Sequence, residues 1–204
     1  MTRVQLVGIW CRSHGADARA LLLMGLGWCL IALTSWIGVP GRDLRLSDDE
    51  ARLVVVGVIG LAVLGALAGR GLHDRLAWQT RLSVRRMRTW RALWFLGLLA
   101  ANGVAAIAVG PLLPPGLLGS PGYLSSVAMW FGIALLSAVV LPVLSALIVP
   151  FALVAALAAT GIVPRAVNPV GNPDLELARW SVGLVTLAIA GVLYAVRGVP
   201  ADRE

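Results

Sequence analysis

The chain has 204 residues, of which 59% are hydrophobic and 13% charged, and its formal net charge is +7. Its mean hydropathy of +0.87 lies above the range of soluble proteins and indicates a membrane protein with several spans. All basic residues are arginines gathered between apolar runs, where membrane orientation and anionic lipid account for them, so nucleic acid is not an expected partner.

The first part of the chain predicts an interfacial segment followed by two spans. Residues 1–19 mix apolar side chains with arginines and predict an amphipathic helix, not a cleavable signal, because the apolar run is short and followed by charge. The first span is expected at 20–39. Ser47 precedes three acids and is expected to cap the helix of the second span, 53–68. Gly65-x-x-x-Gly69 there is a candidate close-packing face.

Residues 70–91 form a basic segment between the second and third spans, with seven arginines against one acid, Asp74. Such a loop is retained in the cytoplasm. Helical periodicity places one set of apolar side chains on one face and four arginines opposite, which predicts an amphipathic helix at the inner membrane surface and then a turn into the third span. The apolar set is Leu72, Leu76, Met87, Trp90 and Trp94, and the basic set is Arg70, Arg81, Arg85 and Arg88.

The second half predicts three or four further spans. The third lies at 92–110 and an uncharged exterior loop follows. Residues 124–162 then run for 39 residues without a charge, which is too long for one straight crossing. We therefore expect two spans, 124–140 and 143–162, with the reversal at Pro142 and a kink at Pro150. Asn172 is expected to cap the helix that carries the last span, 180–196.

The distribution of arginine supports an all-α, six-span membrane domain covering 1–204, with both termini cytoplasmic. Twelve arginines then lie inside and five outside, as the positive-inside rule requires. A five-span arrangement is the alternative, and it would place the C-terminal tail outside.

Most chemistry that marks catalysis or ion coupling is missing. The predicted spans contain no acidic, basic or histidine side chain, which argues against proton or ion coupling. Enzyme motifs and a nucleotide-binding lysine loop are absent, so we expect no enzyme activity and no cofactor. Cys11, His14 and His73 lack the paired spacing of a metal site. Asn102, Trp130 and Phe131 are candidates for lining a substrate cavity, although an amide such as Asn102 more often bonds a neighbouring helix.

The layout resembles the membrane subunits of ABC-2-type exporters, the permeases served by a separate ATPase. The basic stretch LAGRGLHDRLAWQTRLSVRRMRTWRALW at 67–94 resembles the corresponding loop of small permease-like proteins of high-GC bacteria. The resemblance implies that 1–19 is an elbow helix, that 70–91 holds a coupling helix seated on the ATPase, and that 164–172 is an exterior re-entrant region.

These observations lead to one hypothesis and a rival. The first is a dimerising permease subunit in a bacterial cytoplasmic membrane that exports a lipophilic or peptide substrate with a partner ATPase. Arg81, Arg85 and Arg88 would then dock the ATPase, while Leu76, Met87 and Trp90 face the membrane. The rival is a non-transporting scaffold, immunity or regulatory subunit of a larger complex. In that case the basic segment is an anchor that contacts anionic lipid.

Overall fold

The computed structural model describes residues 18–35, 48–72, 84–113, 120–158, 167–170 and 172–199. The described residues form helices and short connections, and no strand occurs among them. The α-helices are α2 (Ala18–Thr34), α3 (Asp48–Arg70), α5 (Val84–Val109), α6 (Ser120–Val140), α7 (Val143–Ala158) and α8 (Glu176–Arg197), and two short 3-10 helices are η1 (Gly110–Leu112) and η3 (Pro173–Leu175).

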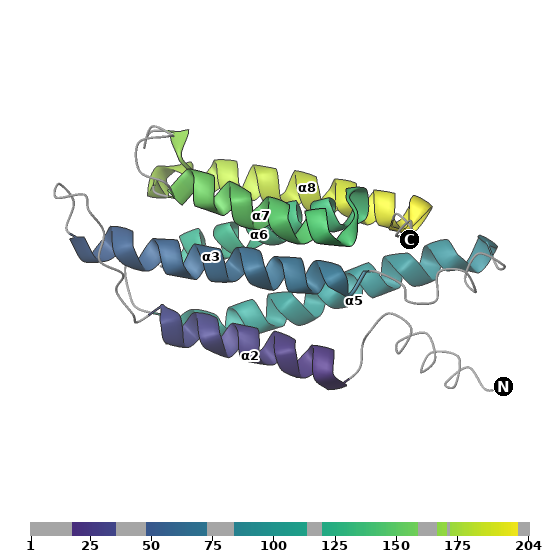
Figure 1. Ribbon diagram of the computed structural model, residues 1–204, viewed down its shortest axis with the longest axis horizontal. Helices are drawn as coiled ribbons and strands as arrows, with labels where there is room; N and C mark the ends of the chain where they lie inside the picture. The colour runs from purple at the N-terminus through teal and green to yellow at the C-terminus, as the bar shows by residue number, and fades with distance from the viewer. Residues whose placement is uncertain are drawn as a thin grey trace.

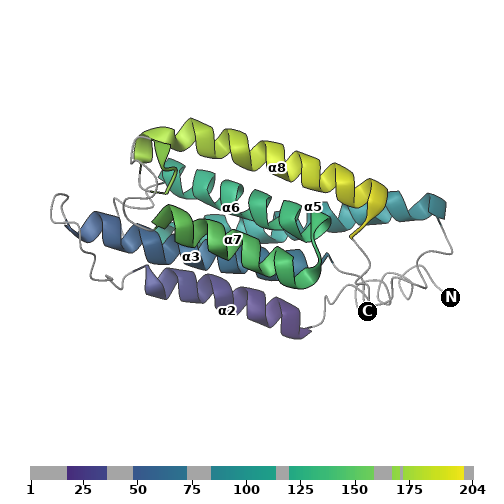
Figure 2. The ribbon, with the colours of Figure 1, turned by 45° about the horizontal axis from the view of Figure 1, so that its top comes forward.

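The six α-helices lie side by side in an up-and-down bundle (Figures 1 and 2). Consecutive helices run in opposite directions, so the first residue of α2 and the last residue of α8 lie at the same end. We call this the basic end, because it holds Arg70, Arg88, Arg91 and Arg197; the opposite end holds the start of α8.

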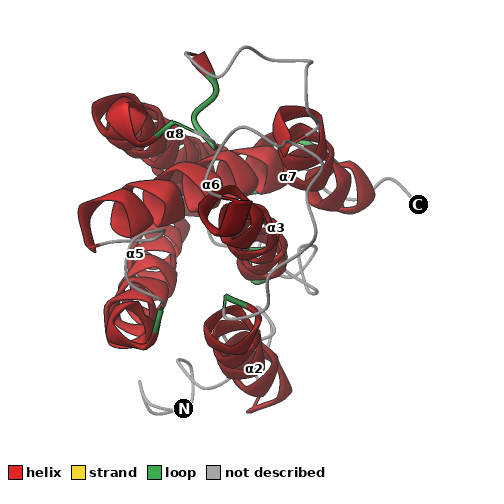
Figure 3. Ribbon diagram, turned by 90° about the vertical axis from the view of Figure 1, so that its left-hand side faces the viewer, coloured by secondary structure: helices red, strands yellow, loops and turns green. Residues whose placement is uncertain are grey.

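Helix α6 lies at the centre of the bundle (Figure 3). It packs most extensively against α8, and also against α3 and α7. Trp130, Ala134 and Leu135 are fully buried on it, and 78% of the apolar window Gly122–Val140 lies inside the protein. The core of the molecule is therefore built around α6.

Small residues allow the helices around α6 to approach closely. A Cβ atom on Gly65 would lie 3.0 Å from the Cβ of Ala134, and one on Gly69 would lie 2.8 Å from the Cβ of Ala138. The predicted Gly65-x-x-x-Gly69 packing face is thus confirmed as a contact between α3 and α6. On the other side, a Cβ on Gly183 of α8 would lie 2.6 Å from the backbone of Ala128, a contact that the sequence pattern did not reveal.

The predicted reversal at Pro142 is confirmed. Helix α6 ends at Val140 and α7 begins at Val143, and the backbone N–H of Leu141 donates to the carbonyl of Ser137 at 2.8 Å. Pro150 lies inside α7, where it is fully buried. The uncharged run is therefore two antiparallel helices and not one long helix.

The sequence predicted an amphipathic surface helix at 70–91 followed by a turn into the third span. For the residues that the structure describes, this prediction is wrong. Leu72 lies in a turn after α3, where its N–H donates to the carbonyl of Gly69 at 3.0 Å. Residues from Val84 onward belong to α5, which continues into the apolar segment without a turn. The physical reason is that no proline or glycine breaks the chain between 84 and 96, so the helix starts in the basic segment. Residues 73–83 lie outside the described part.

The surface of the bundle is apolar. Within the described residues, three helical segments are long and apolar enough to span a membrane, Arg88–Leu112, Gly122–Val140 and Glu176–Arg197, while Leu22–Thr34, Gly57–Arg70 and Leu144–Leu157 are shorter apolar helices. Large hydrophobic side chains are exposed on α2, α5, α7 and α8, for example Leu33, Val104, Leu144 and Val192. Exposed apolar surface on several sides is what a lipid environment requires.

Candidate functional site

The predicted docking arginines lie at the start of α5, as far as the structure describes them. Arg85 and Arg88 belong to the first two turns of this helix, and the Arg88 side chain is exposed. Arg81 and Leu76 lie outside the described residues, and the Met87 side chain is likewise not described. At 26 residues α5 is about 39 Å long, and its first turns extend past the ends of the neighbouring helices (Figure 1).

Two tryptophans follow these arginines on α5. Trp90 is 37% exposed, and the indole Nε1–H of Trp94 donates to the carbonyl of Gly71 at 2.9 Å. This bond ties α5 to the turn after α3. The basic start of α5 is therefore held to the bundle one turn after Trp90. Arg85 and Arg88 lie on a helix whose following turn is fixed to the rest of the protein.

Asn102 joins two helices in the apolar interior. It is 3% exposed, its Oδ1 accepts from the Trp28 indole at 3.2 Å, and its Nδ2 donates to the Leu98 carbonyl at 2.9 Å. The Trp28 ring in turn stacks on Phe131, with ring centroids 5.9 Å apart. Asn102 and Phe131 therefore meet through Trp28, in an arrangement that joins α2, α5 and α6. A substrate cavity at these residues stays a prediction.

Two buried polar groups on α6 have no hydrogen-bond partner among the described residues. The Nε1–H of Trp130 and the hydroxyl of Tyr123 are both buried and unbonded in the described structure. Trp130 is 0% exposed and Tyr123 is 1% exposed. A buried polar group without a partner costs about 1–3 kcal/mol, so α6 carries two local sources of instability.

Arg179 is a buried polar residue whose contacts the sequence analysis did not predict. We expected the last span to begin at Trp180, with Arg179 in the exterior segment. The helix α8 begins at Glu176, so Arg179 lies one turn inside it and is only 5% exposed. The signal was present, because Asn172-Pro173 marks a helix start seven residues before Arg179.

The Arg179 guanidinium ties three segments together. Its Nε–H donates to the hydroxyl of Ser125 on α6 at 2.9 Å. Its Nη1 donates to the carbonyls of Pro169 and Asn172 at 3.0 and 2.9 Å. Charged hydrogen bonds of this kind are stronger than neutral ones. Arg179 therefore fixes the start of α8 against α6 and against the connection that precedes α8.

Two asparagines order the same connection. The Nδ2 of Asn168 donates to the carbonyl of Leu157 in the last turn of α7 at 2.7 Å, and its Oδ1 accepts from the N–H of Val170 at 2.9 Å. The predicted cap at Asn172 is confirmed, because its Oδ1 accepts from the N–H of Asp174 at 3.0 Å. The first turn after the cap is the 3-10 helix η3. The predicted cap at Ser47 lies outside the described residues, directly before the first residue of α3.

The described residues form a packed apolar interior, and their charged side chains lie near the ends of the helices. No group of three or more histidine, cysteine, aspartate or glutamate side chains comes together among them as metal ligands. Polar contacts in the interior join helices, and the exposed arginines gather at the basic end. No family model, curated protein or solved structure matches this chain.

Proposed function

We propose that this chain is the membrane subunit of an ABC-type exporter, working with a separate cytoplasmic ATPase on a lipophilic or peptide substrate. All six helices would cross the membrane, with the basic end in the cytoplasm. The alternating directions of the helices and the apolar surface support this proposal. So does the concentration of arginine at the end where α2 begins and α8 ends, since basic segments are retained inside.

The observation that carries the proposal is the continuity of α5. The helix runs without interruption from Arg85 and Arg88 to Val109 at the opposite end. Along the way Asn102 bonds Trp28 of α2, and Phe95 packs against Tyr194 of α8 with ring centroids 6.2 Å apart. A displacement of the basic start by a docked ATPase would therefore reach two other helices through direct contacts.

The distribution of charge favours an external source of energy. The described acidic and basic residues of the six helices lie in their first or last turns, or, like Arg91, at the basic start of α5. Ion-coupled transporters carry ionisable groups near the middle of the membrane. The described parts of the helices hold no such groups for drawing energy from an ion gradient, so we propose that a partner supplies the energy by hydrolysing ATP.

The close packing around α6 favours a second candidate, a non-transporting scaffold, immunity or regulatory subunit. Gly65, Gly69 and Gly183 bring α3 and α8 into close contact with α6, and such contacts oppose large rearrangements. The two candidates differ in whether the basic end binds an ATPase.

The experiment first asks whether a neighbouring gene encodes a Walker-motif ATPase, then replaces Arg81, Arg85 and Arg88 together by glutamine and tests binding of that ATPase, co-expressed and co-purified in detergent. The exporter proposal expects the wild-type chain to retain the ATPase and the triple variant to lose on the order of tenfold or more of the affinity. Arg70, Arg75, Arg86 and Arg91 remain to hold the orientation.

The matched control replaces three arginines of the predicted exterior segment, Arg42, Arg45 and Arg52, by glutamine, which removes the same charge. This variant is expected to bind the ATPase normally. A wild-type chain that retains no such ATPase, or a triple variant that retains it fully, would favour the non-transporting candidate.

A further inference from the structure

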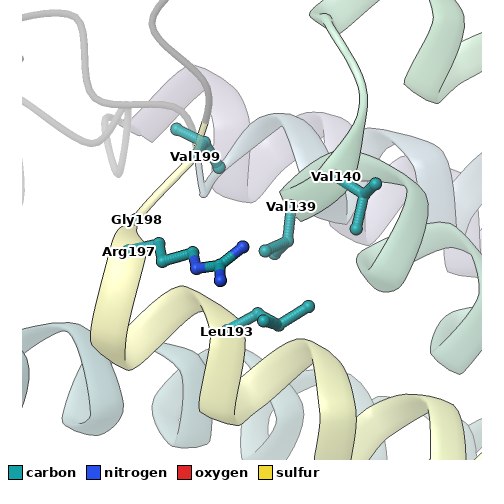
Figure 4. Close-up of a pocket in the computed structure, with 6 residues that line it drawn as sticks. All are labelled: Val139, Val140, Leu193, Arg197, Gly198 and Val199. Atoms are coloured by element: carbon teal, nitrogen blue, oxygen red, sulfur yellow. The ribbon is translucent and has the colours of Figure 1, made fainter.

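A cavity of about 260 Å³ lies at the basic end, between the last turns of α6 and α8 (Figure 4). It has apolar walls and one charged side chain. Its lining residues are Val139, Val140, Leu193, Arg197, Gly198 and Val199. Ligand sites for drug-sized molecules take about 300–1,000 Å³, so this cavity suits a smaller group, such as a single headgroup phosphate.

One guanidinium group, that of Arg197, lines this cavity, and a second, that of Arg91, contacts the lining residue Gly198. The Arg197 side chain extends toward Val139 (Figure 4). The Arg91 guanidinium packs against Gly198, so closely that a Cβ atom there would lie 2.9 Å from Arg91 Cζ. Gly198 has a φ of 75°, which suits glycine and lets the chain leave α8 at this point. Neither arginine forms a hydrogen bond or an ion pair with any residue that the structure describes.

Among the residues that the structure describes, the electrostatic balance at the cavity is positive. The C-terminus of a helix carries a partial charge of about −0.5, and two helices, α6 and α8, end here. Two arginine charges exceed the sum of these partial charges. The described acids lie at the opposite end, in the first turn of α3 and beside the start of α8. An anion is therefore attracted to this end of the bundle.

The apolar wall continues onto the outer surface of α8. Ile189 lies four residues before Leu193 and Val196 three residues after it, so both are neighbours of Leu193 on the helix surface. Their side chains are 45% and 50% exposed. A ligand that joins a negative headgroup to an apolar chain matches both features.

We propose that this cavity is a binding site for an anionic phospholipid, with the phosphodiester at Arg197, the charge of Arg91 behind Gly198 adding to the attraction, and an acyl chain along Ile189 and Val196. Basic pockets between helices at the cytoplasmic face are suited to anionic lipid headgroups. The proposal requires a membrane environment but no transport activity. It can therefore fail or succeed independently of the exporter proposal.

The test measures lipid retention by native mass spectrometry of the full chain purified in detergent with equimolar phosphatidylglycerol and phosphatidylcholine. The wild-type chain is expected to retain one phosphatidylglycerol in preference to phosphatidylcholine. Arg197→Gln and Arg91→Gln should each lower this preference by about fivefold, the effect of one basic residue near an anionic surface. Arg88→Gln removes an exposed charge from the same end and should leave the preference unchanged.

A second variant tests the cavity without altering charge. Val140→Trp fills the space from an exposed position of α6 and should also reduce phosphatidylglycerol retention, whereas Val182→Trp, on the exposed surface of α8 near its other end, should not. Equal retention of the two lipids by the wild-type chain would overturn the proposal. So would equal losses in Arg197→Gln and Arg88→Gln, which indicate surface charge alone, or displacement of the lipid by millimolar inorganic phosphate, which indicates a simple anion site.

Discussion

Helices α5 and α6 are both apolar enough to span a membrane, yet their surroundings differ. Of the apolar window in α6, 78% is buried inside the protein, against 22% in α5. The α6 window meets other helices on most sides, while α5 exposes Leu93, Leu96 and Val104. Hydropathy alone therefore does not distinguish a helix that faces lipid from one that faces protein, because both surroundings are apolar.

The two helices differ in their glycine contacts, although Gly191 of α8 does lie against the Phe95 side chain of α5. Glycines on α3 and α8 lie against the backbone or alanines of α6, so that these helices approach closely. On α5, by contrast, Gly97 and Gly103 have no atom other than their own helix backbone within 4 Å of the position a Cβ would take. A glycine that contacts a neighbouring helix limits substitution, whereas a glycine that faces outward does not.

The largest expected effect comes from adding one methyl group at the contact between α6 and α8. Gly183→Ala places a Cβ 2.6 Å from the carbonyl carbon of Ala128, a backbone atom that cannot move aside alone. We expect a loss of about 3 kcal/mol in the free energy of unfolding, measured by equilibrium unfolding in mixed micelles.

The matched substitution is Gly97→Ala on α5, which adds the same methyl group where nothing lies within 4 Å. It should leave stability unchanged or raise it by up to about 1 kcal/mol, because alanine favours helix more than glycine does. Equal losses in the two variants would mean that α5 is packed against another chain on this face and that the comparison is wrong.

Much of the helical order could be predicted from sequence because it follows from local signals. Pro142 marks the reversal between α6 and α7, and Asn172 with Pro173 marks the start of the last helical segment. The predicted apolar spans, 53–68 and 92–110, begin several residues after the first residues of α3 and α5, Asp48 and Val84. Charged side chains in the first turns of these helices resemble loop residues in a hydropathy pattern, although they are compatible with a helix that extends beyond the apolar layer.

The tertiary arrangement of the polar residues could not be predicted in the same way. Asn102 was expected to bond a neighbouring helix, but its partner Trp28 lies 74 residues away, and no periodicity connects them. Arg179 was assigned to an exterior segment because a charge usually ends a predicted span. Its burial depends on carbonyls of Pro169 and Asn172 and on Ser125, which come together only in the folded bundle.

A second comparison pairs an arginine that contacts α6 with one that is exposed on α5. Arg179→Met removes the donors to Ser125, Pro169 and Asn172 and leaves two carbonyls without these bonds, so we expect a loss of about 2 kcal/mol. Arg88→Met changes an exposed side chain and should stay within about 0.5 kcal/mol of the wild-type chain. If both variants unfold at the wild-type midpoint, the Arg179 hydrogen bonds do not stabilise the bundle.

The smallest expected effect has the opposite sign and tests how completely α6 is buried. The Tyr123 hydroxyl is enclosed without a hydrogen-bond partner, so Tyr123→Phe removes a group that gains nothing from folding. We expect the free energy of unfolding to rise by about 1 kcal/mol, whereas removing a hydroxyl that has a good partner would lower the free energy of unfolding by about the same amount.

Ser125, two residues along the same helix, provides the matched control. Its hydroxyl donates to the Gly122 carbonyl at 2.9 Å and accepts from Arg179, so Ser125→Ala should lower stability by about 1 kcal/mol. A loss of stability in both variants would show that the Tyr123 hydroxyl finds a partner in the membrane, and that this end of α6 is less enclosed than its contacts with the other helices indicate.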